Sequence, residues 1–297
     1  MCRNPYTLFT QINIFRSGVK IKDKDEVIRK LNNIIRGGPE KLQVVTDFDL
    51  TLTKQHVNGK NHLSSFDIFA KCKQLPPTYE ENSIQLAKRY VKIEKDPEIP
   101  LEVKINAMEE WMELGEQNIK GYEFDPTELE EVAEKYGTDL RDGTKILMDK
   151  LNAANLPVLV FSAGLGDVVH AILKHNSVLH PNVEIVSNFL KYSGKMLDGI
   201  RGKKIHVFTK NETNLDPEHL KRLESRKNIL LMGDSLGDTT MTNGIQNIEN
   251  IFKIGFLYSK DDEIVRKSLD AYMNLFDVVL IDDQTMDLPL FILEMIV

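Results

Sequence analysis

Short apolar runs alternate with stretches of helical periodicity along most of this 297-residue chain. The runs are rich in Val, Ile, Leu and Phe, and they lie at Leu42–Thr46, Val158–Phe161, Val183–Ser187, Ile229–Met232, Ile251–Gly255 and Val278–Ile281. Strands that are apolar on both faces are typical of parallel sheets covered by helices. We therefore predict an α/β fold with a doubly wound, Rossmann-like parallel sheet.

Helices are expected around these strands, because apolar residues recur there at three- and four-residue spacing. The expected helices lie near Val27–Ile35, Ile146–Leu151, Val168–His175 and Glu263–Met273, and from Leu288 onward. Gly37-Gly38 supplies a stop for the first of them. Between Lys191 and Gly202 we expect a β-hairpin, with Ser193-Gly194 and Asp198-Gly199 as turn residues.

Between about residues 54 and 141 the texture of the sequence changes. Strand-like runs vanish, charges become dense, and prolines delimit the helices expected at Thr78–Ile93, Leu101–Gln117 and Thr127–Tyr136. A chain of this length accommodates one core domain with a sizeable insertion. We therefore expect a helical cap domain at residues 55–140, inserted into a core formed by residues 1–54 and 141–297, and placed to fold over the site as a lid.

Charge and cysteine content argue against several classes of protein. The 38 Lys and Arg residues against 45 Asp and Glu give a net charge of −7, which disfavours binding to polymeric nucleic acid or an anionic membrane. No apolar run approaches the roughly 20 residues of a membrane span.

Met1–Ser17 lacks a signal-peptide cleavage site, so we expect a partly ordered lead-in. Cys2 and Cys72 are too few for a disulfide scaffold, which fits a cytoplasmic protein. We expect a monomer.

Two carboxylates, Asp47 and Asp49, directly follow the first apolar run. Ligands bind beyond the carboxyl ends of strands in an α/β sheet, which places both acids at the mouth of a site. With Mg²⁺ offsetting their repulsion, Asp47 could attack a phosphorus atom while Asp49 protonates the leaving oxygen. The alternative is that Asp-x-Asp forms only a turn or a helix N-cap, because Asp readily bonds its own backbone.

Two further strands end in polar sequence. After the second, Ser162 offers a hydroxyl, while Ala163 and Gly164 leave backbone N–H groups unobstructed for an anion at a helix start. After another, Asp234 and Asp238 suit one carboxylate on Mg²⁺ and a second that orients the water around it. The alternatives are a simple N-cap at Ser162 and an ordinary Gly-Asp turn.

Lys210 ends the run Ile205–Lys210, which we expect to be extended. At the carboxyl edge of the sheet it would supply a cation for phosphate oxygens, although most lysines are solvated surface charges. Together these residues provide a nucleophile, a general acid, a phosphate cradle, a countercharge and a metal anchor. That combination indicates phosphoryl transfer.

The same residues resemble the four motifs of the haloacid dehalogenase superfamily, at Asp47–Thr51, Ser162, Lys210 and Gly233–Asp238. More closely, the chain resembles the cytosolic 5′-nucleotidase III family, including its branch that acts on 7-methylguanosine monophosphate. The runs that carry this closer resemblance are Thr46–Asp49, Phe161–Asp167, His180–Val183, Val186–Asn188, Ile205–Lys210 and Lys253–Gly255.

The resemblance implies that Asp47 forms an aspartyl-phosphate and that Asp49 protonates the nucleoside leaving group. The residues that it implies for phosphate binding are Ser162, Ala163 and Lys210. The ligands that it implies for Mg²⁺ are Asp47, the backbone carbonyl of Asp49, and Asp234.

The resemblance also implies that the helical insertion recognises the base. Glu94 matches the family's base-binding glutamate, and a carboxylate can accept from a ring N–H or an exocyclic amine. Phe66 and Trp111 are the candidate aromatic residues beside a methylated, positively charged purine. Met112, however, stands where relatives carry a second aromatic residue, so core packing of Trp111 remains an alternative.

We therefore expect a Mg²⁺-dependent 5′-nucleotidase that hydrolyses pyrimidine monophosphates, 7-methylguanosine monophosphate or both. The partner is a small-molecule nucleotide. The alternatives are a phosphatase of the same superfamily that acts on another small phosphomonoester, and a nucleotide-binding module without turnover. The sequence does not rank the three nucleotides CMP, UMP and 7-methyl-GMP.

Overall fold

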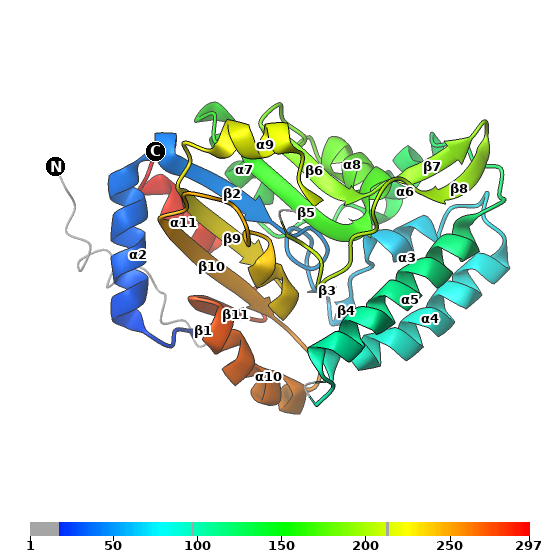
Figure 1. The fold of residues 1–297 in the computed structure, drawn as a ribbon, viewed down its shortest axis with the longest axis horizontal. Coiled ribbons are helices and arrows are strands. Elements are labelled where there is room, and N and C mark those ends of the chain that lie inside the picture. The colour runs from blue at the N-terminus through cyan, green and yellow to red at the C-terminus, as the bar shows by residue number, and fades with distance from the viewer. Residues whose placement is uncertain (1–17, 97, 212–213) are drawn as a thin grey trace.

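The computed structural model describes residues 18–297 except 97 and 212–213, so the lead-in expected at Met1–Ser17 lies outside the described residues. The described chain forms a seven-stranded sheet in the order β1-β11-β10-β9-β2-β5-β6 (Figure 1). Its strands are β1 (Val19–Lys20), β2 (Leu42–Thr46), β5 (Val158–Leu165), β6 (Val183–Asn188), β9 (Asn228–Gly233), β10 (Asn250–Leu257) and β11 (Val278–Ile281). The six predicted strands are confirmed within a few residues.

Parallel pairing joins all these strands except β1, which runs antiparallel to β11 at one edge. The two residues of β1 are too short for a periodic signal, and this strand was not predicted. Strand β2 lies between β9 and β5, where Thr46 pairs with both Met232 and Val160. The acidic tip that follows β2 is therefore in the middle of the sheet and not at its flank.

Helices cover both faces, as a doubly wound sheet requires. They are α2 (Lys24–Gly37), α7 (Thr144–Ala153), α8 (Gly166–His175), α9 (Pro217–Leu223), α10 (Asp262–Leu275) and α11 (Asp287–Glu294). Successive residues of β2 point to opposite faces, so Val44 belongs to one buried cluster and Val45 to the other. The Val44 cluster includes side chains of α2, α7, α8 and α11, and the Val45 cluster includes α9 and α10.

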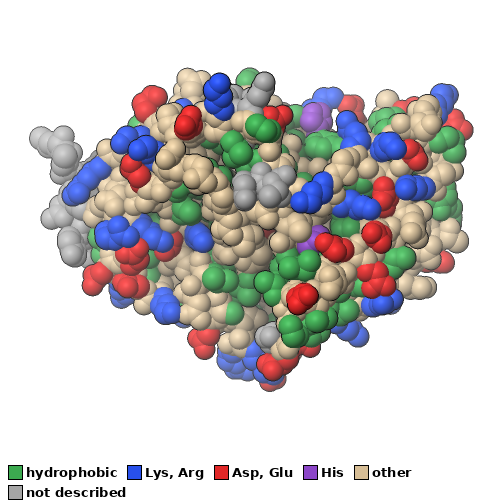
Figure 2. Space-filling model, in the orientation of Figure 1, with side chains coloured by type: hydrophobic (Ala, Val, Ile, Leu, Met, Phe, Trp, Pro, Cys, Tyr) green, Lys and Arg blue, Asp and Glu red, His purple; other side chains and the backbone are tan. Residues whose placement is uncertain are grey.

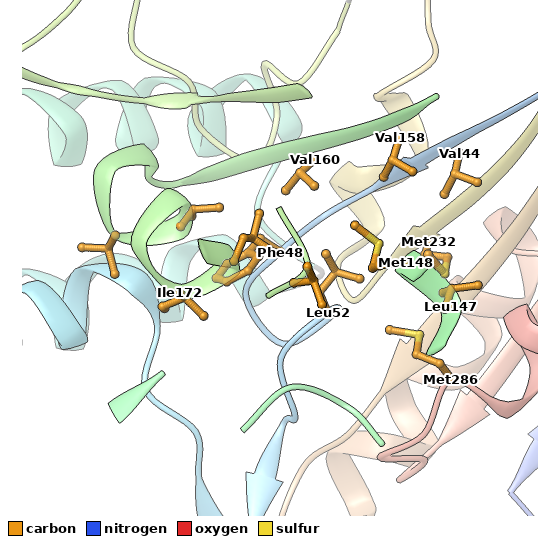
Figure 3. Close-up of a cluster of buried hydrophobic side chains, with 14 of the residues drawn as sticks. Val44, Phe48, Leu52, Leu147, Met148, Val158, Val160, Ile172, Met232 and Met286 are labelled. Carbon is orange, nitrogen blue, oxygen red and sulfur yellow. The ribbon is translucent and has the colours of Figure 1, made fainter. Parts of the chain in front are cut away.

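The larger cluster continues past the end of β2 into the acidic segment. Phe48 and Leu52 are fully buried and lie among Val44, Met148 and Met232 (Figure 3). Because Phe48 is anchored in the core, the backbone on either side of it is held in place. Burying a carboxylate in this apolar cluster would carry a large desolvation cost. Asp47 and Asp49, which flank Phe48, therefore face the site and not the cluster.

The insertion contains α3 (Ser65–Phe69), α4 (Pro77–Lys95), α5 (Leu101–Ile119) and α6 (Glu128–Tyr136), so the three long predicted helices are confirmed. Helices α4 and α5 pack against each other and form an arm beside the sheet (Figure 1). Helix α6 instead packs on α8 of the core, as does α3. The domain boundaries at 55–140 stay a prediction.

Two hairpins lie outside the main sheet. The predicted one is β7 (Leu190–Ser193) and β8 (Met196–Ile200), and it packs against α5. Gly199, expected in a turn, instead lies within β8 at φ 99°. The second hairpin, β3 (His56–Val57) and β4 (Lys60–Asn61), contradicts our expectation that strands vanish in the insertion. Its turn residues Asn58 and Gly59 both have positive φ, which is the conformation that an Asn-Gly pair favours in a two-residue hairpin turn.

The surface agrees with the charge balance of the sequence. On the face shown in Figure 2, Lys and Arg side chains are interspersed with Asp and Glu, and neither sign forms a continuous field. Within residues 18–297, gaps aside, no helix combines the length and apolar character needed to cross a membrane.

Candidate active site

Asp47 lies where β2 ends, in a buried position at the middle of the sheet. Its backbone N–H still donates to the Met232 carbonyl at 3.0 Å, which extends the pairing with β9 by one residue. Its carboxylate forms a buried ion pair with Lys210, whose Nζ also donates to Asp238 Oδ1 at 2.6 Å. The lysine is 3% exposed, so this cation and its two carboxylates form one desolvated group.

The loop that brings Lys210 to this position is not the extended run that we predicted. Residues 205–210 form no strand, and a turn bond joins Thr209 N–H to the His206 carbonyl at 2.9 Å. The side chain of Asn188 fixes the start of the loop, because it donates to the Ile205 carbonyl and accepts from the Ile205 N–H, both at 2.8 Å. The prediction failed because these tertiary bonds, and not local β propensity, determine the backbone.

Three acidic side chains come together where β2 and β9 end. One carboxylate oxygen from each of Asp47, Asp234 and Asp238 lies within 4.8 Å of the others. Carboxylate oxygens are the ligands that Mg²⁺ prefers, so the donor set fits the expected ion. Asp238 is already engaged by Lys210 and by the Asp234 and Ser235 N–H groups, at 3.1 and 2.9 Å. The assignment of Asp47 and Asp234 as ligands of the ion stays a prediction.

The segment after β2 is bent sharply and held by a buried arginine. Leu50 has φ 62°, a strained conformation for a residue other than glycine. Arg141, which is 1% exposed, donates from Nη2 to the Leu50 carbonyl at 2.6 Å and from Nε to the Thr51 carbonyl at 2.7 Å. Its Nη1 donates to the Asp283 carbonyl, and its guanidinium lies 3.9 Å from the centre of the Phe256 ring. No sequence signal identified this arginine as part of the site.

Asp49 turns toward the insertion and not toward the acidic cluster. Its two carboxylate oxygens accept from the N–H and the hydroxyl of Ser65, at 2.8 and 2.7 Å. Burial raises the pKa of Asp49 to about 6 and that of Asp47 to about 7. A general acid works best when its pKa is near the working pH, and Asp49 meets that condition. Burial lowers the pKa of Lys210, but the charges of Asp238 and Asp47 outweigh that effect. The pKa of Lys210 is therefore raised overall.

Ser162 and Ala163 lie near the end of β5, which runs on to Leu165 and is longer than predicted. Ser162 Oγ accepts from the Gly164 N–H at 3.0 Å. The carbonyls of Ala163 and Gly164 accept from Asn188 Nδ2 at 2.8 Å and from Ser187 Oγ at 2.9 Å. These bonds from β6 fix the orientation of the peptide planes in the expected phosphate cradle. The sequence marked the motif that contains both β6 residues, but it did not indicate this role.

The base-binding candidates lie on three helices of the insertion. Glu94 is in the last turn of α4, and its charge reaches the phenol of Tyr272. The pKa of Tyr272 is raised mainly by burial, with Asp234, Asp238 and then Glu94 adding to it. Tyr272 donates to the Asp234 carbonyl at 2.6 Å, which joins α10 to the end of β9. The predicted contact of Glu94 with a base stays a prediction.

The two aromatic candidates are placed differently. Phe66, on α3, follows Ser65 directly, is half-buried and packs against the main core cluster. Trp111, on α5, stacks on the buried Tyr90 of α4, with ring centroids 5.7 Å apart and planes at 11°. Trp111 therefore contributes to packing between α4 and α5, and the predicted contact of Phe66 and Trp111 with a base stays a prediction.

Comparison with known proteins shows that this chain is similar to 5′-nucleotidases. Residues 50–297 match the family described as Pyrimidine 5′-nucleotidase (UMPH-1). The 7-methylguanosine phosphate-specific 5′-nucleotidase of Drosophila melanogaster is 41% identical over 280 residues, covering 93% of this chain and 86% of the relative. The Homo sapiens protein of the same name is 32% identical, covering 92% and 91%. The crystal structure of cytosolic 5′-nucleotidase IIIB bound to cytidine superposes with a TM-score of 0.91 at 40% identity, covering 97% of both chains.

Proposed function

This chain belongs to the pyrimidine 5′-nucleotidase (UMPH-1) family, the cytosolic 5′-nucleotidase III branch of the haloacid dehalogenase superfamily, and we propose that it hydrolyses CMP and 7-methylguanosine monophosphate. The observation that carries this proposal is the buried group of Asp47, Lys210 and Asp238, with the half-buried Asp234 beside it, where β2 and β9 end. Such a group has the nucleophile, the cation and the metal ligands of a phosphomonoester hydrolase. We place the enzyme in the cytoplasm, acting as a monomer.

In the first half of the proposed reaction, Asp47 attacks the phosphorus atom of the nucleotide. The bond between phosphorus and O5′ breaks, and the carboxyl group of Asp49 gives its proton to O5′, so that the nucleoside leaves as an alcohol. Lys210 and the cradle at Ser162 and Ala163 hold the phosphoryl oxygens while their charge redistributes.

In the second half, Asp49 works in the reverse direction. Its carboxylate takes a proton from water, the water oxygen attacks phosphorus, and the bond between phosphorus and Asp47 breaks. Phosphate leaves and Asp49 is again protonated, which closes the cycle. Mg²⁺ held by Asp47 and Asp234, with the Asp49 carbonyl as its third protein ligand, would offset the charge of phosphate and carboxylates.

Substrate choice rests on the similarity to named relatives together with the placement of Glu94. Two relatives carry 7-methylguanosine phosphate in their names, and the matching crystal structure holds cytidine. A carboxylate at Glu94 can accept from the exocyclic amine of either base, which supports a pocket that takes both nucleotides.

The test is phosphate release from CMP, UMP, 7-methyl-GMP, GMP and AMP, measured side by side with Mg²⁺ present. The proposal predicts CMP and 7-methyl-GMP as the best substrates and no turnover by Asp47→Asn. Binding of either nucleotide without turnover would favour a binding module instead. Faster release from a phosphorylated sugar or acid would favour a different phosphatase of the superfamily.

A further inference from the structure

Ser65 is the first residue of α3, in the inserted segment, and it is fully buried. It gives one donor to each oxygen of the Asp49 carboxylate: the backbone N–H to Oδ1 at 2.8 Å and the hydroxyl to Oδ2 at 2.7 Å. The terminal torsion of an aspartate is intrinsically broad, so one hydrogen bond leaves the carboxyl plane free to rotate. Two donors from one rigid residue fix that plane.

The Ser65 hydroxyl is itself fixed from the other side. Its Oγ accepts from the Leu165 N–H at 3.0 Å, at the junction of β5 and α8. Because the oxygen accepts there, its own proton is directed at Asp49. Ser65 therefore links the acid on the β2 loop to the strand that carries the expected phosphate cradle.

Gly164 shows how closely these groups approach each other. A Cβ placed on Gly164 would clash with Ser65 Oγ, and it would lie 2.6 Å from Asp49 Oδ2 and 3.1 Å from Ser162 Oγ. The side chains of Asp49, Ser65 and Ser162 thus all lie close to Gly164, which has no side chain of its own. The absence of a Cβ at Gly164 is what allows Asp49 and Ser65 to lie this close to Ser162.

We propose that Ser65 is a positioning residue that holds Asp49 in the orientation needed to protonate O5′. This inference rests on the function proposed above. In the step concerned, the proton passes from the Asp49 carboxyl to O5′ as the bond between phosphorus and O5′ breaks. Ser65 keeps its own proton and does not touch the substrate.

A leaving-group comparison tests this role more sharply than activity alone. The alkoxide of a nucleoside needs a proton in order to leave, whereas p-nitrophenolate does not. The ratio of kcat/KM for CMP to kcat/KM for p-nitrophenyl phosphate therefore reports acid assistance in the first half-reaction. Loss of folded enzyme lowers both values equally and leaves the ratio unchanged.

Ser65→Ala should lower this ratio about 10- to 100-fold, since general acid catalysis contributes on the order of 10²- to 10⁴-fold and misplacement removes only part of it. Ser65→Cys, which keeps a weaker donor on a somewhat larger atom, should give a smaller loss. The matched control is Ser64→Ala. Ser64 caps the same helix through Asp67, accepting from its N–H at 3.2 Å and donating to Oδ2 at 2.7 Å, and it does not contact Asp49. Its ratio should stay at the wild-type value.

An unchanged ratio in Ser65→Ala would overturn the inference, as would an equal fall in Ser64→Ala, because the effect would then come from α3 as a whole. Asp49→Asn, measured in parallel, separates this outcome from failure of the proposed function. If Asp49→Asn lowers the ratio and Ser65→Ala does not, the acid is assigned correctly and its positioning is not. If the wild-type enzyme releases no phosphate from nucleotides, the proposed function itself fails.

Discussion

Replacing Lys210 by Met removes one charge from the centre of the site while keeping the length of the side chain. Lys210 is buried between Asp47 and Asp238, with its Nζ paired to both carboxylates. Without the cation, two buried acids lose their shared partner. The fold and the chemistry should both respond, and the two responses can be measured separately.

The loss of stability follows from the burial of this group. Breaking a buried ion pair by removing one partner costs about 3–5 kcal/mol of unfolding free energy, because the remaining charge is uncompensated. Burial raises the pKa of Asp47 to about 7 with the lysine present, and the lysine itself lowers it. Its removal raises that pKa further, so Asp47 takes up a proton and the expected loss at neutral pH is about 3 kcal/mol. The loss should be larger at pH 8 than at pH 6, because Asp47 is protonated at the lower pH.

Urea unfolding of the metal-free protein at pH 6 and pH 8 measures both values. Lys227→Met is the control, because Lys227 pairs with Glu249 on the surface, and its unfolding transition should stay in place. In parallel, kcat on CMP should fall about 10²- to 10³-fold, the usual effect of removing one group that stabilises transition-state charge. A stability loss under about 1 kcal/mol at pH 8, or equal losses at the two pH values, would refute the charge-sharing argument.

Three further outcomes are expected. Glu94→Ala should change the ranking of CMP and 7-methyl-GMP while p-nitrophenyl phosphate turnover stays within about threefold, since a lost base contact is worth roughly 1–3 kcal/mol; an unchanged ranking would remove Glu94 from the pocket. Gly164→Ala should lower kcat on CMP at least about 100-fold, because its Cβ would meet Ser65 and Asp49 and displace the acid by an ångström or so; wild-type kinetics would contradict the geometry. Since the pKa values of Asp47 and Asp49 are raised to about 7 and about 6, urea unfolding in EDTA should show stability falling as pH rises from about 4 to 7. Mg²⁺ should reverse the part of the fall that comes from Asp47, whose ionised carboxylate would hold the ion.

The elements that the sequence predicted well are those in which local pattern and global fold agree. The apolar run before Asp47 was predicted as a buried strand, and the position of this acid at the sheet's carboxyl edge followed from that topology. Lys210 was placed correctly at the same edge, but its backbone was not, because Asn188 holds the start of the loop through bonds over 17 residues. Asn58-Gly59 carried a readable turn signal, but the two-residue strands on either side of it are too short to show an alternating pattern.

Other parts of the site have no local signature. Ser65 contacts Asp49 across 16 residues, and Arg141 contacts Thr51 across 90. A serine at a helix start and an arginine after a charged insertion are ordinary in sequence, and each gains its role only when the fold closes. These residues became identifiable once the structure showed which hydrogen bonds they make.

Phosphoryl transfer through Asp47 is the central claim, and a rapid acid quench tests it most directly. Enzyme mixed with CMP and Mg²⁺ and quenched within the first turnover should carry a phosphoryl group on the peptide that contains Asp47, detected by mass spectrometry and absent from Asp47→Asn. Cytidine and phosphate released in step, with no phosphoryl group on any peptide at any quench time, would mean that water attacks phosphorus directly and would contradict the account.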